Sequence, residues 1–248
     1  MIETSKVALI TGAARRVGAE IACVLHARGI NVVLHYQQSA SEAKALSERL
    51  NAERKHSALI LKADLTQTPE LNSLVKQAAA EWGRLDILIN NASRFYKTKL
   101  ESATEVAWDD LIDSNLKAPF FLAQSAADYL KKQRGCIVNI ADVHADRPMR
   151  DYSIYCISKA GLVMLTEVLA KELGPDIRVN AVSPGTVMLP EGENELSDER
   201  KEKIINRIAL QRYGSANDVA KAVLYLVQDA DYVTGQVVTV DGGRSLMI

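Results

Sequence analysis

The chain has 248 residues, of which 48% are hydrophobic and 25% are charged, and its net charge is −1. These values are typical of a globular protein that can bury a sizeable core within a single α/β domain. The nearly neutral charge gives no support for binding of nucleic acid or of a membrane surface through bulk charge, and no apolar run approaches the length of about 18 residues that a membrane span needs.

Short apolar runs alternate with longer helical patterns along the whole chain. Several runs are unbroken and aliphatic, as expected of parallel strands that are buried on both faces. The alternation predicts an α/β fold: a single Rossmann-like domain, residues 1–248, with a doubly wound parallel seven-stranded sheet and helices on both faces. In chain order, the predicted strands are Val7–Thr11, Val32–His35, Ala58–Leu61, Ile87–Asn90, Cys136–Ile140, Arg178–Val182 and Val237–Val240, and the predicted helices lie near residues 16–28, 40–53, 69–82, 104–133, 153–173 and 216–228.

One region breaks this alternation. Residues 186–200 contain Pro190, Gly192 and a concentration of Glu and Asp. The region follows a predicted strand, and open α/β sheets bind their ligands beyond the carboxyl ends of strands. We predict a mobile substrate loop here; the alternative is a plain surface excursion.

The three cysteines, Cys23, Cys136 and Cys156, are far apart and lack the spacing of metal ligands. We interpret them as core thiols in a reducing compartment and predict no metal site. The first residues, Met-Ile-Glu-Thr-Ser-Lys, lack the basic and apolar regions of a signal peptide. The sequence therefore predicts a cytoplasmic protein.

The first predicted strand runs directly into the segment TGAARRVG, residues 11–18. A strand, a turn containing glycine and a helix N-terminus together form a phosphate site from backbone N–H groups and the helix dipole. Arg16 stands where the usual dinucleotide fingerprint has its middle glycine. We predict a dinucleotide site that includes Gly12, Arg15, Arg16 and Gly18.

The end of the second predicted strand indicates which dinucleotide binds. An acidic residue there would bind the 2′-hydroxyl of adenosine and select NAD, but the segment HYQQS has none. Arg15 can reach a 2′-phosphate, which requires donors and positive charge. We therefore predict NADPH as the cofactor, with His35, Tyr36 and Ser39 at its adenosine end. Asp64, after the third strand, either accepts from the adenine amino group or caps the next helix.

Tyr155 and Lys159 stand four residues apart. This is about one helical turn, so both side chains lie on one face. A tyrosine hydroxyl is a poor acid or base at neutral pH because its usual pKa is about 10. The lysine charge is expected to lower the tyrosine pKa, which suits acid–base catalysis. The pattern is common by chance, so it is informative only together with the rest of the chain.

Taken in order, these segments resemble the short-chain dehydrogenase/reductase family over nearly the whole chain. The resemblance implies that Asn115, Tyr155 and Lys159 form the catalytic group. It also implies that Asn115 holds a helix kink and an ordered water, that Lys159 binds the nicotinamide ribose, and that the protein is a homotetramer. Besides the turn at residues 11–18 and the catalytic group, the resemblance is carried by Asn90-Asn91-Ala92, Pro184-Gly185 and Asp241-Gly242-Gly243. The further cofactor contacts that it implies come from Asn91, Ala92, Ser93, Pro184 and Gly185.

Several departures from the common family pattern resemble the pteridine reductases within this family. They are the Arg-Arg-Val-Gly turn, His35-Tyr36, the segment NASRFY at residues 91–96, and Asp142. By this resemblance Arg16 contacts cofactor phosphate and pterin, Ser93 binds cofactor and pterin, and Phe95 stacks on the pterin ring opposite the nicotinamide. Asp142, thirteen residues before Tyr155, replaces the family serine and works with the tyrosine.

One position departs from this branch as well. Gln38 stands where some pteridine reductases have an arginine. An arginine would add positive charge at the 2′-phosphate. We therefore expect a weaker preference for NADPH over NADH than a doubly basic site would give.

The chemistry of Asp142 separates the candidate substrates. A ketone reductase needs a neutral hydroxyl beside the carbonyl oxygen, and an ionised aspartate would repel a developing alkoxide. A pterin instead presents ring N–H groups and an amino group, which donate to a carboxylate. If the carboxyl is protonated, it can also pass a proton to a ring nitrogen. A flat bicyclic ring suits a slot between Phe95 and a nicotinamide.

We therefore predict an NADPH-dependent reductase of pterins, and of folates if the loop leaves room for the glutamyl tail. The first alternative is a carbonyl or 3-oxoacyl thioester reductase of the same fold. A second is a non-catalytic dinucleotide-sensing protein. Taken singly, Phe95 could be a core residue, Asp142 a strand-end cap and Ser93 a turn residue; His144 is assigned no role.

Overall fold

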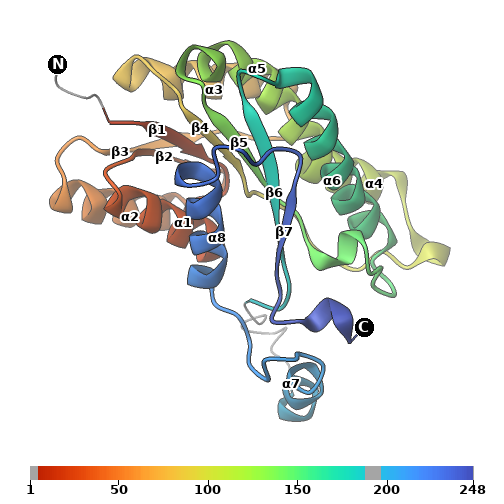
Figure 1. Ribbon diagram of the computed structural model, residues 1–248. Helices are drawn as coiled ribbons and strands as arrows, with labels where there is room; N and C mark the ends of the chain where they lie inside the picture. The colour runs from red at the N-terminus through yellow and green to blue at the C-terminus, as the bar shows by residue number, and fades with distance from the viewer. Residues whose placement is uncertain (1–4, 188–196, 248) are drawn as a thin grey trace.

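The computed structural model describes residues 5–187 and 197–247, and its centre is one seven-stranded sheet (Figure 1). All six neighbouring strand pairs are parallel, in the order β3-β2-β1-β4-β5-β6-β7. The predicted Rossmann-like fold is thus confirmed. The strands are β1 (Val7–Ile10), β2 (Asn31–Tyr36), β3 (Ala58–Lys62), β4 (Ile87–Asn90), β5 (Cys136–Ile140), β6 (Arg178–Pro184) and β7 (Val237–Val240).

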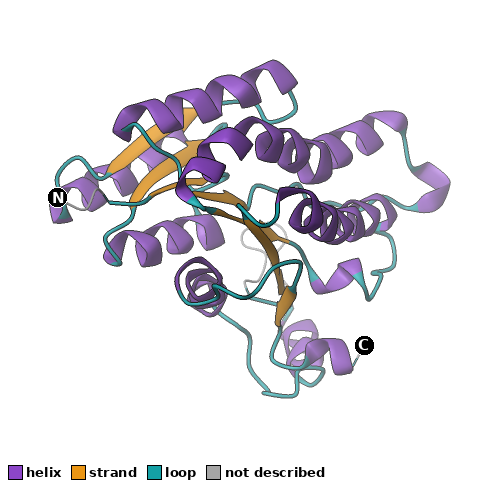
Figure 2. Cartoon of the chain, turned by 45° about the horizontal axis from the view of Figure 1, so that its top comes forward, coloured by secondary structure: helices purple, strands orange, loops and turns teal. Residues whose placement is uncertain are grey.

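Helices cover both faces of the sheet, as Figure 2 shows in purple around the orange strands. Side chains alternate along each strand, so Val7 and Leu9 enter one core while Ala8 and Ile10 enter the other. The first core is closed by α3 (Thr68–Trp82), α5 (Ala118–Gln133) and α6 (Ser153–Leu173), and the second by α1 (Arg16–Ala27), α2 (Ala40–Glu53) and α8 (Ala216–Gln228).

The strand order reverses direction between β1 and β4, where the chain crosses from one half of the sheet to the other. Open α/β sheets bind ligands at this point, beyond the carboxyl ends of the strands. The predicted site residues follow those ends: Gly12 comes after β1, Asp64 after β3, Asn91 after β4 and Asp142 after β5. The topology therefore gathers residues that are far apart in the sequence at one edge.

The long helical pattern at residues 104–133 is divided in the structure. It consists of α4 (Glu105–Ile112), a five-residue π-helix (Asp113–Lys117) and α5. Pro119, in the first turn of α5, has no N–H to donate to the Asn115 carbonyl four residues earlier. This missing donor accounts for the irregular hydrogen bonding before it.

The predicted substrate loop at 186–200 is partly wrong, because α7 (Asp198–Ile205) begins inside it. Asp198 and Glu199 lie in the first turn of this helix, where negative charge is favoured by the helix dipole. They also pair with lysines three and four residues later, at 3.3 and 2.6 Å. Pro190 and Gly192 lie outside the described residues, so the rest of this prediction stays open.

The cysteines are only partly as expected. Cys136 and Cys156 are buried thiols, whereas Cys23 is partly exposed. The Cys23 sulfur accepts a hydrogen bond from the Arg49 guanidinium at 2.9 Å. Cys23 therefore lies at the edge of the second core, where it packs against buried residues.

Among the described helices, α6 is long and apolar enough to cross a membrane by length and composition. However, 56% of its most apolar window is buried inside the protein. It packs against β6 and carries both Tyr155 and Lys159. We therefore interpret α6 as a core helix of the fold.

Candidate active site

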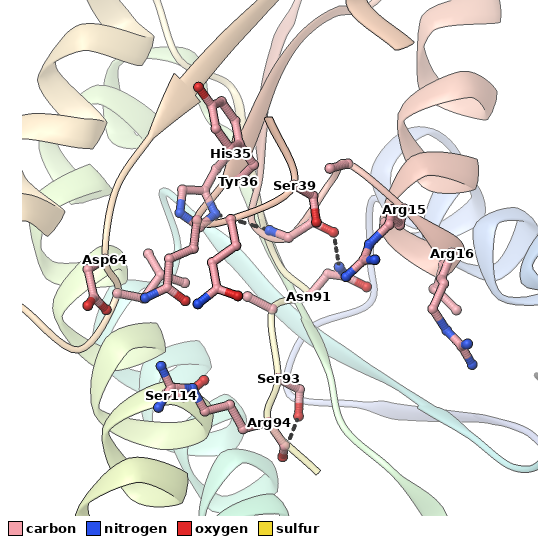
Figure 3. A pocket seen from close by; sticks show the side chains of 18 of the residues that line it. Arg15, Arg16, His35, Tyr36, Ser39, Asp64, Asn91, Ser93, Arg94 and Ser114 are labelled. Atoms are coloured by element: carbon pink, nitrogen blue, oxygen red, sulfur yellow. Dashed lines mark hydrogen bonds between the residues drawn. The ribbon is translucent and has the colours of Figure 1, made fainter. Parts of the chain in front are cut away.

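A cleft of about 730 Å³ lies along the carboxyl edge of the sheet, at the ends of β1 to β4. In the view of Figure 3, Asp64 and Arg16 lie on opposite sides, with His35 and Asn91 between them. The volume is in the range of small-molecule sites. The lining residues that the sequence had pointed to are Gly12, Arg15, Arg16, Gly18, His35, Tyr36, Ser39, Asp64, Asn91, Ala92 and Ser93.

The glycine turn brings backbone groups close together. Gly12 has a φ of +62°, a left-handed conformation that suits glycine. A Cβ on Gly18 would lie 2.3 Å from the Gly12 carbonyl oxygen, so α1 packs directly on the turn. The amide of Asn91 donates to the carbonyls of Thr11 at 2.8 Å and Gly12 at 3.1 Å, which fixes the turn from the next strand.

The N-terminus of α1 faces the same cleft. Arg15, in the capping position, makes no side-chain capping bond, and Arg15 and Arg16 both line the cleft. The first backbone N–H groups of a helix and its dipole attract anions. A close-packed glycine turn, a helix start without a side-chain cap and two guanidinium groups therefore fit a dinucleotide diphosphate.

Arg16 keeps the backbone geometry of the glycine that it replaces. Its φ is +55°, and an L-residue pays about 1–2 kcal/mol for the left-handed conformation. Residues held in such conformations cluster at functional sites. The strain is consistent with a binding role for this side chain rather than with simple loss of the motif.

His35 has a structural role that the sequence did not indicate. It is 2% exposed; its Nδ1 accepts from the Gly12 N–H at 3.1 Å, and its Nε2 lies 3.2 Å from the Ala63 carbonyl oxygen. These partners require the neutral tautomer with the proton on Nε2. Burial lowers the pKa of His35, which keeps this form at neutral pH. His35 therefore positions the glycine turn through its ring.

The end of the cleft that is predicted to bind adenosine contains an ion pair and a local turn. The Arg15 guanidinium lies 3.6 Å from the Glu42 carboxylate, and both side chains are exposed. Asp64 accepts from the N–H and the hydroxyl of Thr66 at 3.0 and 2.8 Å. Gln67, not Asp64, is the N-cap of α3. The capping role considered for Asp64 is therefore wrong, because its carboxylate closes a local turn instead.

The predicted catalytic residues meet beside the end of β5. The Tyr155 hydroxyl donates to Asp142 Oδ2 at 2.7 Å, and Asp142 Oδ1 accepts from the His144 N–H at 2.8 Å. Lys159 is 2% exposed, and its ammonium donates to the Ile140 carbonyl at 2.8 Å. The ammonium also lies 5.8 Å from the centre of the Tyr155 ring. The carboxylate, the hydroxyl and the ammonium thus form one cluster.

The pKa of Tyr155 in this cluster is shifted in the direction opposite to the expected one. Burial and the Asp142 carboxylate raise the pKa of Tyr155 well above its ordinary value. Burial lowers the pKa of Lys159 to about 8, and the charge of Asp142 opposes this shift. The expectation of a lowered tyrosine pKa is therefore wrong for this structure, because burial and the carboxylate that is bonded to the hydroxyl raise it. Tyr155 holds its proton and can act as a donor.

Asn115 lies in the π-helix and joins it to the loop after β4. Its Oδ1 accepts from the Arg94 N–H at 2.8 Å and from the Ser93 hydroxyl at 3.2 Å. Its amide donates to the Arg94 carbonyl at 3.0 Å and to Ser158 Oγ at 3.1 Å. Ser158 in turn donates to the Tyr155 carbonyl at 2.7 Å. Asn115 therefore links the loop to the catalytic helix.

The ring of Phe95 lies next to Tyr155. Its side chain is 53% exposed, so it is not a core residue. The ring stacks on Tyr152 at 4.8 Å and 16°, and it meets the Tyr155 ring edge-on at 4.8 Å and 81°. A flat apolar surface is thus available beside Tyr155.

Pro184 and Gly185 are not among the residues that line this cleft. The Gly185 N–H donates to the Val240 carbonyl at 3.0 Å, and a Cβ on Gly185 would lie 2.6 Å from the Asp241 Cβ. This glycine therefore allows close packing between the ends of β6 and β7. Its assignment to the cofactor stays a prediction.

The sequence reasoning missed several residues of the cleft wall, and two of them contact each other. Arg94 and Asp110 both line the cleft and form an ion pair with each other. The position of Arg94 directly before Phe95 was a sequence signal for Arg94. Asp110 lies sixteen residues later, and its contact with Arg94 depends on how the loop folds onto α4. The sequence alone gives no measure of that approach.

Comparison with known proteins agrees with the fold. A family model described as enoyl-(acyl carrier protein) reductase matches residues 12–245. The chain is 38% identical to pteridine reductase 1 of Leishmania tarentolae, over 98% of this chain and 97% of that protein. It is 37% identical to the 3-oxoacyl-acyl-carrier-protein reductase FabG of Staphylococcus aureus strain Mu50, over 98% of this chain and 99% of the relative. It is 35% identical to FabG of Thermotoga maritima, over 96% of this chain and 97% of that protein. The chain therefore belongs to the short-chain dehydrogenase/reductase family of oxidoreductases.

Proposed function

We propose that this oxidoreductase uses NADPH to reduce pterins. The observation that carries the proposal is the 2.7 Å hydrogen bond from the Tyr155 hydroxyl to the Asp142 carboxylate, beside the exposed ring of Phe95. A carboxylate there would repel the alkoxide that develops from a ketone. It would accept hydrogen bonds from the ring N–H and amino groups of a pterin.

The residues around the cleft suit NADPH. The Gly12 turn, the N-terminus of α1 and Arg16 would hold its phosphates, and Arg15 would meet the 2′-phosphate. Support comes from the lack of an acidic residue among residues 35–39. When bound, the nicotinamide supplies a hydride to a pterin ring carbon.

The protein residues then have separate tasks. Tyr155, whose pKa is raised by burial and by Asp142, keeps its proton and gives it to the substrate directly or through water. Asp142 accepts from the ring donors and orients the Tyr155 hydroxyl. The buried ammonium of Lys159 offsets the negative charge that Tyr155 acquires when its proton leaves. Phe95 covers one face of the ring.

The alternative is reduction of a 3-oxoacyl thioester. It is favoured by the relatives named as 3-oxoacyl-acyl-carrier-protein reductases, since 37% identity is close to the 38% shared with pteridine reductase 1. Asp142 counts against it on the electrostatic argument given above. A dinucleotide sensor without catalysis is disfavoured by the intact Tyr155 and Lys159. Action on folates, a homotetramer and a cytoplasmic location remain predictions.

The test is NADPH oxidation measured in parallel with dihydrobiopterin, dihydrofolate and an acetoacetyl thioester. We expect the highest kcat/KM with dihydrobiopterin. Tyr155→Phe should lower turnover by about 10²–10⁴, the usual value of general acid catalysis, and leave NADPH affinity within a few-fold. A higher kcat/KM for the thioester in the wild-type enzyme would overturn the proposal in favour of the alternative.

A further inference from the structure

The loop that carries Phe95 is fixed at both ends. At its start, the main chain of Arg94 forms two hydrogen bonds with Asn115. At its far end, the Thr98 N–H donates to the Asp151 carbonyl at 2.7 Å, and Thr98 Oγ1 accepts from the Ile154 N–H at 3.3 Å. The residues between these anchors, 95–97, are exposed. Something further must therefore set the direction of the Phe95 ring.

One carboxylate on α4 binds both neighbours of Phe95. Asp110 forms an ion pair with the Arg94 guanidinium and accepts from the Tyr96 hydroxyl at 2.9 Å. The same hydroxyl lies 3.3 Å from the Ala107 carbonyl oxygen, one turn earlier on α4. Residues 94 and 96 thus reach toward α4, while the ring of residue 95 contacts Tyr152 and Tyr155 on α6 and its start.

The pair is sheltered more than an ordinary surface pair. The side chains of Arg94 and Asp110 are 33% and 29% exposed. Partly buried ion pairs that share a carboxylate with a hydroxyl donor are screened less by water than isolated surface pairs. The arrangement can therefore hold a loop whose own side chains are exposed.

We infer that Asp110 is a positioning residue that fixes the ring of Phe95 beside Tyr155 through Arg94 and Tyr96. The inference rests on the proposed function insofar as this ring receives a flat heterocycle. A ring that is already ordered loses less conformational freedom when the substrate binds. Asp110 should thus act on the KM for the pterin rather than on the chemical step.

The experiment uses five variants of the whole chain. Asp110→Ala removes both bonds, Phe95→Ala removes the ring, and a third variant combines the two. The matched control is Asp109→Ala, since Asp109 is the exposed neighbour of Asp110 on α4. Tyr96→Phe deletes only the hydroxyl that donates to Asp110. It replaces Asp110→Ala in the test if that variant fails to fold.

The first measurement is amide hydrogen exchange of the protein without ligands. Exchange in residues 93–98 should be faster in Asp110→Ala, and faster to a smaller degree in Tyr96→Phe, but unchanged in Asp109→Ala. Unchanged exchange in both Asp110→Ala and Tyr96→Phe overturns the inference. This result is independent of any substrate, whereas failure of the proposed function would appear as wild-type enzyme that does not turn over dihydrobiopterin.

The second measurement is steady-state kinetics with dihydrobiopterin and NADPH. We expect Asp110→Ala to raise the pterin KM by about three- to tenfold, the scale of ordering one side chain, with little change in kcat. The double variant should have the pterin KM of Phe95→Ala, because the two substitutions remove the same interaction. Additive effects of the two substitutions on the pterin KM would overturn the inference.

Discussion

Asp142 affects the pKa values of two neighbouring side chains, Tyr155 and Lys159. Its carboxylate accepts the Tyr155 hydroxyl and raises the pKa of that residue, together with burial. The same charge opposes the effect of burial on the pKa of Lys159. A serine at this position would be neutral and could do neither. In the proposed function, the choice between pterin and ketone therefore depends on this side chain.

Asp142→Ser is expected to lower kcat/KM for dihydrobiopterin by at least about tenfold, roughly 1.4 kcal/mol of transition-state stabilisation. The change removes the acceptor for ring donors and the orientation of the Tyr155 hydroxyl. It should raise any weak activity on an acetoacetyl thioester, because a neutral hydroxyl replaces an anion. Asp142→Asn separates charge from size. If both variants reduce dihydrobiopterin at the wild-type rate between about pH 5 and 8, Asp142 is structural.

From the pKa of Lys159 we predict the pH above which activity falls. Burial lowers its pKa from 10.5 to about 8, so the ammonium is present below about pH 8 and is lost as the pH rises. Since the ammonium offsets charge on Tyr155, kcat/KM should fall above about pH 8. Lys159→Met should have a low rate at every pH and no such inflection. An inflection that persists unchanged in Lys159→Met would belong to another group.

The same pKa has the opposite consequence for stability. Between about pH 8 and 10.5 the unfolded chain holds a proton on Lys159 that the folded chain has lost. The contribution of Lys159 to the free energy of unfolding therefore rises with pH across this window. As the pH increases above about 8, kcat/KM should therefore fall while the contribution of Lys159 to the free energy of unfolding rises.

At the scale of elements, the strands were predictable to within about two residues because parallel strands bury both faces and read as aliphatic runs. The division of residues 104–133 was not predictable from the helical pattern. It depends on Pro119 and on contacts of Asn115 with a loop that arrives from β4. Part of the region at 186–200 was wrong for a related reason: its acidic residues were taken as a loop signal, and some of them begin α7.

We expect the starts of α1 and α2 together to set the cofactor preference. Glu42 lies in the first turn of α2 and 3.6 Å from Arg15, so it competes with a 2′-phosphate for the guanidinium. Glu42→Gln should raise the ratio of kcat/KM for NADPH to that for NADH by a few-fold, since both groups are exposed and the pair is weak.

The control for this prediction lies on the same helix. Glu48 pairs with Lys44 at 3.8 Å, and Glu48→Gln makes the same change in net charge. The cofactor ratio should stay at the wild-type value in that variant. An equal change in both variants would point to bulk charge and remove the assignment of Glu42.

At the scale of the whole molecule, the site exists only after the sheet has formed. The sequence identified the kinds of residue at the strand ends, and their roles are predictions from the family resemblance. It could not give the approach of Asp110 to Arg94, or the burial that sets the pKa of Tyr155 and Lys159. Both depend on how separate strands and helices pack around the cleft.

A chain of buried polar side chains joins the sheet to the catalytic helix beneath the site. Asn90, at the end of β4, donates to Asn139 Oδ1 at 2.8 Å, and the Asn139 amide donates to Thr166 Oγ1 on α6 at 2.9 Å. All three residues are at most 3% exposed. Asn139 therefore connects two strands and α6 in a region without solvent.

Asn139→Ala is expected to destabilise the molecule by at least about 1–3 kcal/mol, because it leaves the buried Asn90 amide without its acceptor. In a domain of this size each kcal/mol lowers Tm by about 2–4 °C. The measurement is thermal unfolding, with Asn72→Ala as the control, since Asn72 is exposed on α3 and surface substitutions usually stay within about 0.5 kcal/mol. The cavity left by the missing amide adds to the loss. If Asn139→Ala unfolds at the same temperature as Asn72→Ala, the buried chain contributes nothing to holding α6 against the sheet.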